Sequence, residues 1–259
     1  MQQSISKIAV AGSGNVAWHL SEGLMQCGYQ ISSVWSRNQE HAKAFAEELG
    51  AKCCNQAGEL CIDSDVIVIA VSDAAIAEIA QQLSGFKGIV VHTAGSVGMD
   101  VFYDGPKHCG VVYPLQTFSK GITVKLSEVP FFVEANTEEV LSVLNEMVSK
   151  LSAKIYVADS QQRMLLHVAA VFAGNYSNLM YGIGNKILDT AAVPHDVLYP
   201  LIAETARKAL SSDPLNTQTG PARRNDRQTL ETHLEALAGM PAFAMLYDVL
   251  ARTITETYK

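Results

Sequence analysis

The chain has 259 residues, of which 48% are hydrophobic and 17% are charged. This composition is typical of a globular protein with one large domain or two modest ones, and it excludes a chain that works in a disordered state. The formal net charge of −7 disfavours broad binding to nucleic acid or to an anionic membrane surface, so we expect neither as a partner.

The cysteines and the N-terminus favour a reducing compartment. The five cysteines are odd in number and form no C-x-x-C pair, so the sequence predicts neither a disulfide framework nor a metal site. The first apolar run, Ile8–Ala11, ends at Gly12 and is too short for the core of a signal peptide. We therefore expect a cytoplasmic protein.

Residues 1–158 alternate short β-branched runs with helical patterns, which predicts βαβ units and a parallel sheet. The run VIVIAV (Val66–Val71) has no polar alternation, as expected of a central strand covered on both faces. Strands are expected at Lys7–Ala11, Gln30–Trp35, Val66–Ala70, Gly88–His92, Cys109–Tyr113, Phe131–Val133 and Lys154–Val157, with helices at Val16–Cys27, Asn38–Leu49, Ala74–Leu83 and Glu138–Leu151.

After Val157 the whole pattern is helical. Asp159 and Gln162 predict a capping box that opens a long helix ending near Leu188. Further helices are expected at Pro194–Leu210, with a kink or a later start at Pro200, and at Arg224–Leu237 and Pro241–Thr255. The sequence thus predicts a doubly wound, mostly parallel α/β domain at residues 1–158 and an all-α domain at residues 159–259.

One segment could be mistaken for a membrane span. Met164–Asn185 carries no charged residue and exceeds the ~20 residues that cross a bilayer. Because it contains His167, Asn175 and Asn178, we predict a buried helix instead.

The sharpest motif is Gly12-Ser13-Gly14-Asn15-Val16-Ala17, a G-x-G-x-x-A pattern between the first strand and the first helix. Gly12 permits a tight turn, Gly14 lets the backbone approach a pyrophosphate, and Ala17 allows close helix packing. The helix N-terminus offers unpaired N–H groups to the phosphates. A tight turn without a ligand is the alternative, but this context favours a dinucleotide site formed by Gly12 through Val16.

The end of the second strand indicates which dinucleotide binds. An NAD site usually carries an acidic residue there, whereas this chain has Ser36, Arg37 and Asn38. Arg37 can form charge-assisted hydrogen bonds to a 2′-phosphate, which favours NADP(H). The alternative is a solvated arginine before a helix.

Loops at the carboxyl ends of later strands are expected to face the same crevice. Val71, Ser72 and Thr93 are predicted to contact the cofactor, and Ser96 and Gln116 the substrate. Asp73 is equally well explained as the cap of the following helix.

Two clusters remain. At ~100° per residue, His167, Asn178 and Asn185 fall within ~20° of one another on the long helix, with Asn175 on the same side. Buried polar groups need partners, which are either structural or a substrate. The arginines between Arg223 and Arg227, Arg224 among them, suit an anionic substrate, a subunit contact or a solvated helix start.

These segments together resemble a known group. GSGNVA and WSRN followed by a helical domain resemble the 6-phosphogluconate dehydrogenase-like superfamily. VHTAGS, YPLQTF, LHVAAVFAGNYSNL and TGPARRNDRQTLETHL are similar to a bacterial family of NADP oxidoreductases with a Rossmann-like domain and a C-terminal domain of unknown function. The resemblance implies an NADP(H)-linked oxidoreductase that dimerises through its helical domain.

The chain departs from its characterised relatives at one point. β-Hydroxyacid dehydrogenases and ketopantoate reductase carry a catalytic lysine on the first long helix. Here the corresponding face carries His167, Val171, Asn175 and Asn178, and Lys186 lies near the helix end. Either His167 takes the proton-transfer role, since imidazole exchanges protons near neutral pH, or the lysine chemistry is absent.

The predicted function is hydride transfer between NADP(H) and a small carbonyl, imine or hydroxyacid-type substrate in the cleft between the domains. His167 and Asn175 are the expected catalytic residues, and Ser96, Gln116, Asn178 and Arg224 are expected to bind the substrate. One alternative is a non-catalytic NADP-binding sensor or interaction protein. Another, which rests on superfamily analogy alone, is deazaflavin-dependent reduction of NADP.

Overall fold

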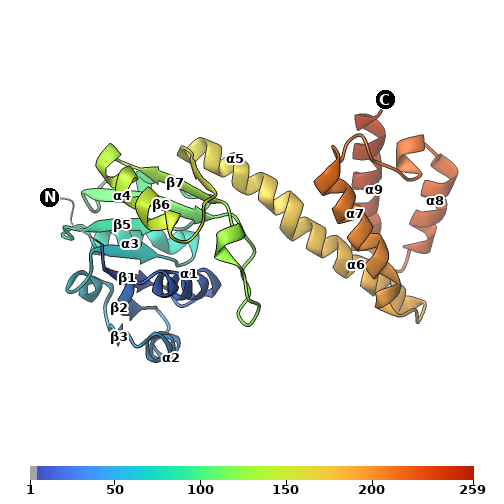
Figure 1. Ribbon diagram of the computed structural model, residues 1–259. Helices are drawn as coiled ribbons and strands as arrows, with labels where there is room; N and C mark the ends of the chain where they lie inside the picture. The colour runs from blue at the N-terminus through green and yellow to red at the C-terminus, as the bar shows by residue number, and fades with distance from the viewer. Residues whose placement is uncertain (1–4) are drawn as a thin grey trace. The chain divides into compact units, whose positions relative to one another are not determined.

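The computed structural model describes residues 5–259. The chain divides into two compact units, Met1–Gly174 and Asn175–Lys259, which are described in turn (Figure 1).

The first unit is built on a sheet with strand order β3-β2-β1-β4-β5-β6-β7-β8. Its strands are β1 (Lys7–Ala11), β2 (Gln30–Trp35), β3 (Lys52–Cys53), β4 (Val66–Ile69), β5 (Ile89–His92), β6 (His108–Pro114), β7 (Phe131–Ala135) and β8 (Ile155–Val157). Neighbouring strands are parallel except β6 and β7, which are antiparallel. This confirms the predicted doubly wound, mostly parallel Rossmann sheet.

Helices cover both faces of this sheet because its central strands are apolar on both sides. The helices are α1 (Asn15–Gln26), α2 (Gln39–Leu49), α3 (Ile76–Gln82) and α4 (Glu138–Ser149). On β1, Ile8 and Val10 pack into the core under α1, α2 and α4, whereas Ala9 and Ala11 pack into the core under α3. The alternate residues of β4 divide in the same way, as the unbroken apolar run predicts.

Helix α5 (Ser160–Ala170) follows β8 and begins at the predicted capping box. The Asp159 carboxylate accepts from Gln162 N at 2.7 Å, and Gln162 Oε1 accepts from Asp159 N at 3.0 Å. A π-helical segment, Val171–Tyr176, comes next. The last strand therefore ends at Val157, where the sequence predicts. The compact units divide at Gly174, and the domain boundary at residue 158 stays a prediction.

The second unit is helical, as predicted. Its helices are α6 (Ser177–Thr190), α7 (Tyr199–Ser211), α8 (Arg227–Ala236) and α9 (Pro241–Thr257). Pro200 lies in the first turn of α7, where its missing N–H is not needed. Of the two predicted effects of Pro200, the helix therefore starts later and is not kinked. A 3₁₀ segment at His195–Leu198 fills the gap before it.

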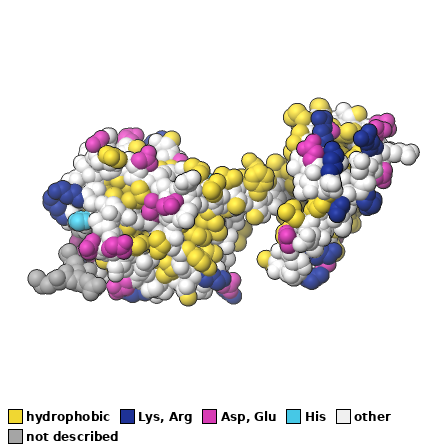
Figure 2. All heavy atoms as spheres, turned by 90° about the horizontal axis from the view of Figure 1, so that it is seen from above, with side chains coloured by type: hydrophobic (Ala, Val, Ile, Leu, Met, Phe, Trp, Pro, Cys, Tyr) yellow, Lys and Arg dark blue, Asp and Glu magenta, His cyan; other side chains and the backbone are white. Residues whose placement is uncertain are grey.

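One short strand has no signal in the sequence, and one helix predicted to be buried is exposed. Lys52–Cys53 is too short to show an alternating pattern, so β3 was not predicted. The segment Met164–Asn185 is not buried in the chain: Leu165 is 65%, Val168 45% and Leu179 51% exposed. Hydrophobic side chains are exposed along α5 (Figure 2). Between residues 5 and 259, no helix is long and apolar enough to cross a membrane.

Candidate functional site

The turn between β1 and α1 has the geometry of a dinucleotide-binding turn. Gly12 has φ +127°, and its N–H donates to Trp35 O at 2.7 Å. A Cβ at Gly12 would lie 2.1 Å from Ala70 O, so no larger residue fits between β1 and β4. A Cβ at Gly14 would meet no heavy atom within 4 Å, so open space lies in front of this residue.

The N-terminus of α1 is free to bind an anion. Gly14 is its N-cap, no side chain caps its first N–H groups, and its first turn holds no acidic residue. The side chain of Asn15 points elsewhere and donates to Phe118 O at 2.8 Å. The backbone from Gly12 to Val16 thus offers open space and uncapped N–H groups that suit an anion, and the Asn15 amide is engaged elsewhere.

The end of β2 lies beside this turn, since the hydroxyl groups of Ser13 and Ser36 are 3.1 Å apart. Asn38 caps α2 by accepting from His41 N at 3.0 Å, which leaves its NH₂ group available. Arg37 is exposed, and no other side chain among residues 5–259 binds its guanidinium. A free guanidinium next to the glycine-rich turn suits a ribose 2′-phosphate.

Loops after β4 and β5 meet at the same edge of the sheet. Val71 and Ser72 follow β4, and Thr93 is buried directly after β5. The Ser96 hydroxyl donates to the Asp73 carboxylate, which joins the two loops. A 3₁₀ turn at Asp73–Ala75 precedes α3, and Ser72 occupies its N-cap position. Asp73 therefore does not cap a helix, and its carboxylate binds Ser96 instead.

The loop after β6 is tied to α1. Besides the bond from Asn15, His19 Nε2 lies 3.2 Å from Ser119 O. The His19 ring also contacts the tilted Phe118 ring, with centroids 4.8 Å apart. Gln116 is exposed in this loop, and its Oε1 accepts from Thr117 N at 2.8 Å, which leaves its NH₂ group as a donor.

Helix α5 brings His167 to the same unit. His167 Nδ1 lies 3.1 Å from the Tyr113 hydroxyl at the end of β6, and its ring lies against Gly95 in the loop after β5. His167 is half-buried. The residues predicted to bind the cofactor thus lie within one unit together with His167. They occupy the loops after β1, β2, β4 and β5, and His167 lies on α5 beside the end of β6.

A buried ion pair holds α5 in place. Arg163, one helical turn before His167, is only 1% exposed and pairs with the carboxylate of Glu134 on β7. Its guanidinium also donates to Val97 O, and Ser160 donates to Glu134 through both its N–H and its hydroxyl. These bonds fix where α5 lies against β7 and the loop after β5.

The other histidine of this region is structural. His92 at the end of β5 is fully buried, and its Nδ1 accepts from Ala94 N at 3.2 Å. Burial and then the charge of Arg163 lower the pKa of His92 to about 4, so its ring is neutral near pH 7. A buried imidazole that stays neutral near pH 7 is a poor acid, so His92 is not a candidate for proton transfer.

The second unit holds Asn175, Asn178 and Arg224. Asn175 lies in the π-helical segment, a feature that is frequent at functional sites. The π-helical segment lies between His167 and Asn178, and the angle of ~100° per residue holds only in an uninterrupted α-helix. The predicted alignment of His167 with Asn178 on one helix face is therefore wrong. Asn178 and Asn185, both in α6, still share a face.

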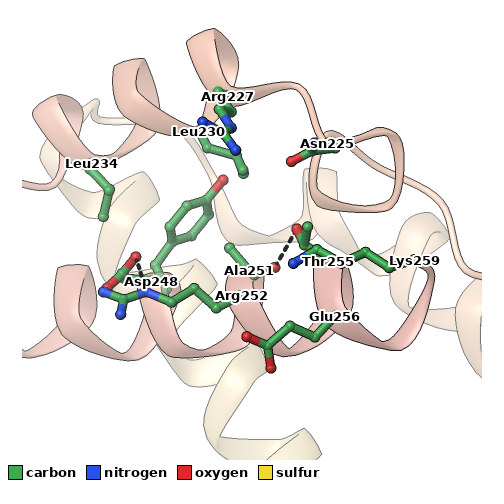
Figure 3. A pocket seen from close by; sticks show the side chains of 11 residues that line it. Asn225, Arg227, Leu230, Leu234, Asp248, Ala251, Arg252, Thr255, Glu256 and Lys259 are labelled. Carbon is green, nitrogen blue, oxygen red and sulfur yellow. Dashed lines mark hydrogen bonds and ion pairs between the residues drawn. The ribbon is translucent and has the colours of Figure 1, made fainter.

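The arginine cluster divides among several roles. The guanidinium carbon of Arg223 lies over the Tyr258 ring, 4.2 Å from its centroid. Asp226 caps α8 by accepting from Thr229 N. Arg227 lines a cavity of about 190 Å³ between α8 and α9, where Arg252 is paired with Asp248 (Figure 3). Arg224 is exposed and does not line this cavity.

A larger cavity lies away from these residues. It measures about 970 Å³ and is lined by residues at the amino ends of β4, β5 and β6, including Asp65, Ile89 and His108. None of the predicted site residues lines it. Ligands of doubly wound sheets bind at the carboxyl ends of the strands, so this cavity is not part of the candidate site.

Sequence reasoning missed Gly95, Tyr113, Glu134 and Arg163. Arg163 is separated from Glu134 by 29 positions and His167 from Tyr113 by 54, so no local pattern links them. The available signal was Arg163 itself, the charge that immediately precedes the uncharged segment of the long helix.

The fold and the turn define a dinucleotide-binding α/β protein. Residues 7–94 match a family model described as NADP oxidoreductase, coenzyme F420-dependent, and residues 129–254 match a domain of unknown function. A crystal structure from Bacteroides fragilis, described as an NADP oxidoreductase, is 40% identical with a TM-score of 0.91, covering 97% of this chain and 98% of that one. The chain belongs to this family of NADP oxidoreductases, which confirms the predicted cofactor and enzyme class.

More distant structures share the fold. A pyrroline-5-carboxylate reductase from Coxiella burnetii is 16% identical with a TM-score of 0.57, covering 99% of this chain and 100% of that one. A reductive aminase from Aspergillus terreus, solved with NADPH and ethyl-5-oxohexanoate, is 16% identical with a TM-score of 0.71. The match covers 98% of this chain and 95% of that one. No curated protein matches the sequence.

The two glycines of the turn give a matched test. Gly12→Ala should lower the melting temperature and abolish NADPH binding, because the added Cβ meets Ala70 O at a positive φ. Gly14→Ala should lower the melting temperature by no more than ~5 °C, the cost of alanine at an N-cap, yet bind NADPH at least ~10-fold more weakly, because its Cβ enters the open space where the pyrophosphate is expected. Thermal melts and NADPH fluorescence titrations check both, and wild-type affinity in Gly14→Ala would contradict the assigned turn.

Proposed function

We propose that the protein transfers a hydride between NADP(H) and a small carbonyl, imine or hydroxyacid-type substrate at the carboxyl ends of the sheet. One observation carries the proposal: the glycine-rich turn, the free guanidinium of Arg37 and the imidazole of His167 all belong to loops or helices at this edge of the first unit. A cofactor site and an acid–base group at one sheet edge are the two parts that such a reaction requires.

Each residue has a defined task in this proposal. When bound, NADPH supplies the hydride. The backbone of Gly12–Val16 binds the pyrophosphate, Ser36, Arg37 and Asn38 bind the ribose phosphate, and Val71, Ser72 and Thr93 border the cofactor. His167 exchanges a proton with the oxygen or nitrogen of the substrate.

Substrate contacts are assigned from the groups that remain available. Ser96 donates to Asp73, so its oxygen can accept a hydrogen bond from the substrate, and Gln116 retains its NH₂ donor. From the second unit we assign Asn175 to catalysis and Asn178 and Arg224 to substrate binding. Carbonyl and imine substrates are supported by the fold shared with a pyrroline-5-carboxylate reductase and a reductive aminase.

The absence of the superfamily lysine from the His167 face supports a second candidate, a sensor that binds NADP without turnover. The two functions predict different results in one assay. We expect NADPH oxidation with members of a panel of ketoacids, aldehydes and cyclic imines. Tight NADPH binding with no oxidation on any substrate would favour the sensor.

His167→Gln tests the proton role. This variant should lose ~10²- to 10⁴-fold in kcat, the usual contribution of a positioned acid or base, while NADPH affinity stays at the wild-type value. His41→Gln is the matched control, because His41 is exposed on α2 and should leave both quantities unchanged. Full turnover in His167→Gln would remove this residue from the mechanism.

Arg37→Ala tests cofactor selection. A charge-assisted hydrogen bond contributes ~1.5–3 kcal/mol, so NADPH should bind ~10- to 150-fold more weakly, whereas NADH binding should change little. Lys43→Ala removes the same charge from an exposed position on α2 and should affect neither nucleotide. An equal loss for NADPH and NADH would show that Arg37 does not read the 2′-phosphate.

We further propose that residues 1–158 are the NADP-binding domain and residues 159–259 a helical substrate and dimerisation domain. The argument for a homodimer is the apolar surface of the helices. Large exposed apolar areas on soluble proteins mark interaction sites. The exposed hydrophobic residues include Met164, Leu165, Val168, Leu179, Val197, Tyr199, Leu201, Met245, Val249 and Leu250.

Sedimentation should therefore give a mass of twice the 27.9 kDa chain. Replacing Leu165 and Val168 by lysine should shift the protein towards monomer, because a charge cannot be buried in an apolar contact without a partner. The control is Ile62→Lys, which places the same charge on an exposed apolar residue of the first unit. A monomeric wild type would contradict the dimer.

A further inference from the structure

Tyr113 lies beside the proposed acid–base histidine, and the proposed function gives it no task. Its hydroxyl is 3.1 Å from His167 Nδ1, and the two rings meet edge to face with centroids 6.0 Å apart. Tyr113 is only 9% exposed, and its ring also lies near Phe132 on β7. The phenol is therefore held on the sheet side of the imidazole.

Gly95 provides an independent observation. A Cβ at this position would lie 2.7 Å from His167 Nδ1 and 2.8 Å from Tyr113 Cζ. Such distances are shorter than real side-chain contacts, so any larger residue would push the two rings apart. The backbone after β5 thus leaves the space in which the phenol and the imidazole meet.

The charges around the pair favour a phenol that donates. Burial raises the pKa of Tyr113, and the positive charge of Arg163 offsets this only in part, so the hydroxyl keeps its proton near pH 7. Arg163 is itself paired with Glu134, and the neighbouring His92 is neutral. A phenol that keeps its proton can donate to Nδ1 whenever that imidazole nitrogen carries no proton.

We propose that Tyr113 is a positioning residue that donates to Nδ1 of His167 and holds the neutral imidazole with its proton on Nε2. Nε2 is then the atom that exchanges a proton with the substrate. This inference rests on the proposed function for its chemical consequence, whereas the state of the imidazole can be measured without any substrate.

The contact between Tyr113 and His167 also provides a proton that replaces the one His167 gives to the substrate. A neutral imidazole that gives up its Nε2 proton alone would become an anion. Reduction by the hydride that bound NADPH would supply needs one proton at the substrate oxygen or nitrogen. His167 gives this proton as its Nε2–H bond breaks. The Tyr113 proton moves to Nδ1, so His167 remains neutral as the other tautomer, and the phenolate takes a proton from water.

The tautomer of His167 is the direct test. In the full chain labelled with ¹⁵N-histidine, two-bond ¹H–¹⁵N spectra at pH ~8.5 report which ring nitrogen carries the proton. The His167 signals are those that disappear in His167→Gln. We expect a larger separation between Nδ1 and Nε2 shifts for His167 than for the exposed His41, since only His167 has a fixed donor at Nδ1.

Two variants should remove this difference. Tyr113→Phe deletes only the hydroxyl, and Gly95→Ala separates the rings while keeping both, so each should bring the His167 shifts to those of His41. Tyr103→Phe and Gly85→Ala are matched controls, because Tyr103 is 91% exposed and a Cβ at Gly85 meets nothing within 4 Å. Wild-type His167 shifts equal to those of His41, or unchanged shifts in both variants, would overturn the proposal.

Kinetics separate this inference from the proposed function. With any substrate that the wild type reduces, Tyr113→Phe should lower kcat ~10-fold while KM and NADPH affinity stay within ~2-fold. If the wild type reduces nothing, the proposed function fails and the tautomer still decides whether Tyr113 positions His167. If His167→Gln is inactive but Tyr113→Phe keeps full kcat, the proposed function stands and the role of Tyr113 is wrong.

Discussion

The ion pair between Arg163 and Glu134 determines where the first long helix meets the sheet. Arg163 is 1% exposed, so removing either partner would leave a charge without its counterion and cost ~3–5 kcal/mol. Because His167 lies one turn further along the same helix, the bonds that Arg163 makes to Glu134 and Val97 also fix the imidazole beside Tyr113. A charged side chain, rather than an apolar one, therefore docks α5 and sets the geometry of the candidate acid–base group.

Much of the fold could be predicted because its signals are local. The glycine-rich turn, the strand bounds of β1 and β2 and the capping box at Asp159 each depend on residues within a few positions of one another. The two-residue β3 and the π-helical Val171–Tyr176 leave no such signal. The candidate site was predictable only in part, since Arg163, Glu134 and Tyr113 meet His167 through contacts between distant segments.

The long apolar helix shows how composition alone can mislead. Its uncharged run suggested burial within the chain, yet Leu165 and Val168 are exposed, and the buried residue of α5 is Arg163. An apolar helix face needs a cover, which a second copy of the chain would provide in the proposed dimer. The same helix carries His167, the proposed acid–base group, so its sequence bears on both assembly and chemistry.

The most direct test of hydride transfer follows a label from cofactor to product. NADPH carrying deuterium at the transferable position of the nicotinamide is incubated with the protein and a panel of ketoacids, aldehydes and cyclic imines, and the products are examined by mass spectrometry and NMR. Hydride transfer by this protein predicts deuterium on the former carbonyl or imine carbon of a product. Saturating NADPH binding with no deuterium in any product would contradict it.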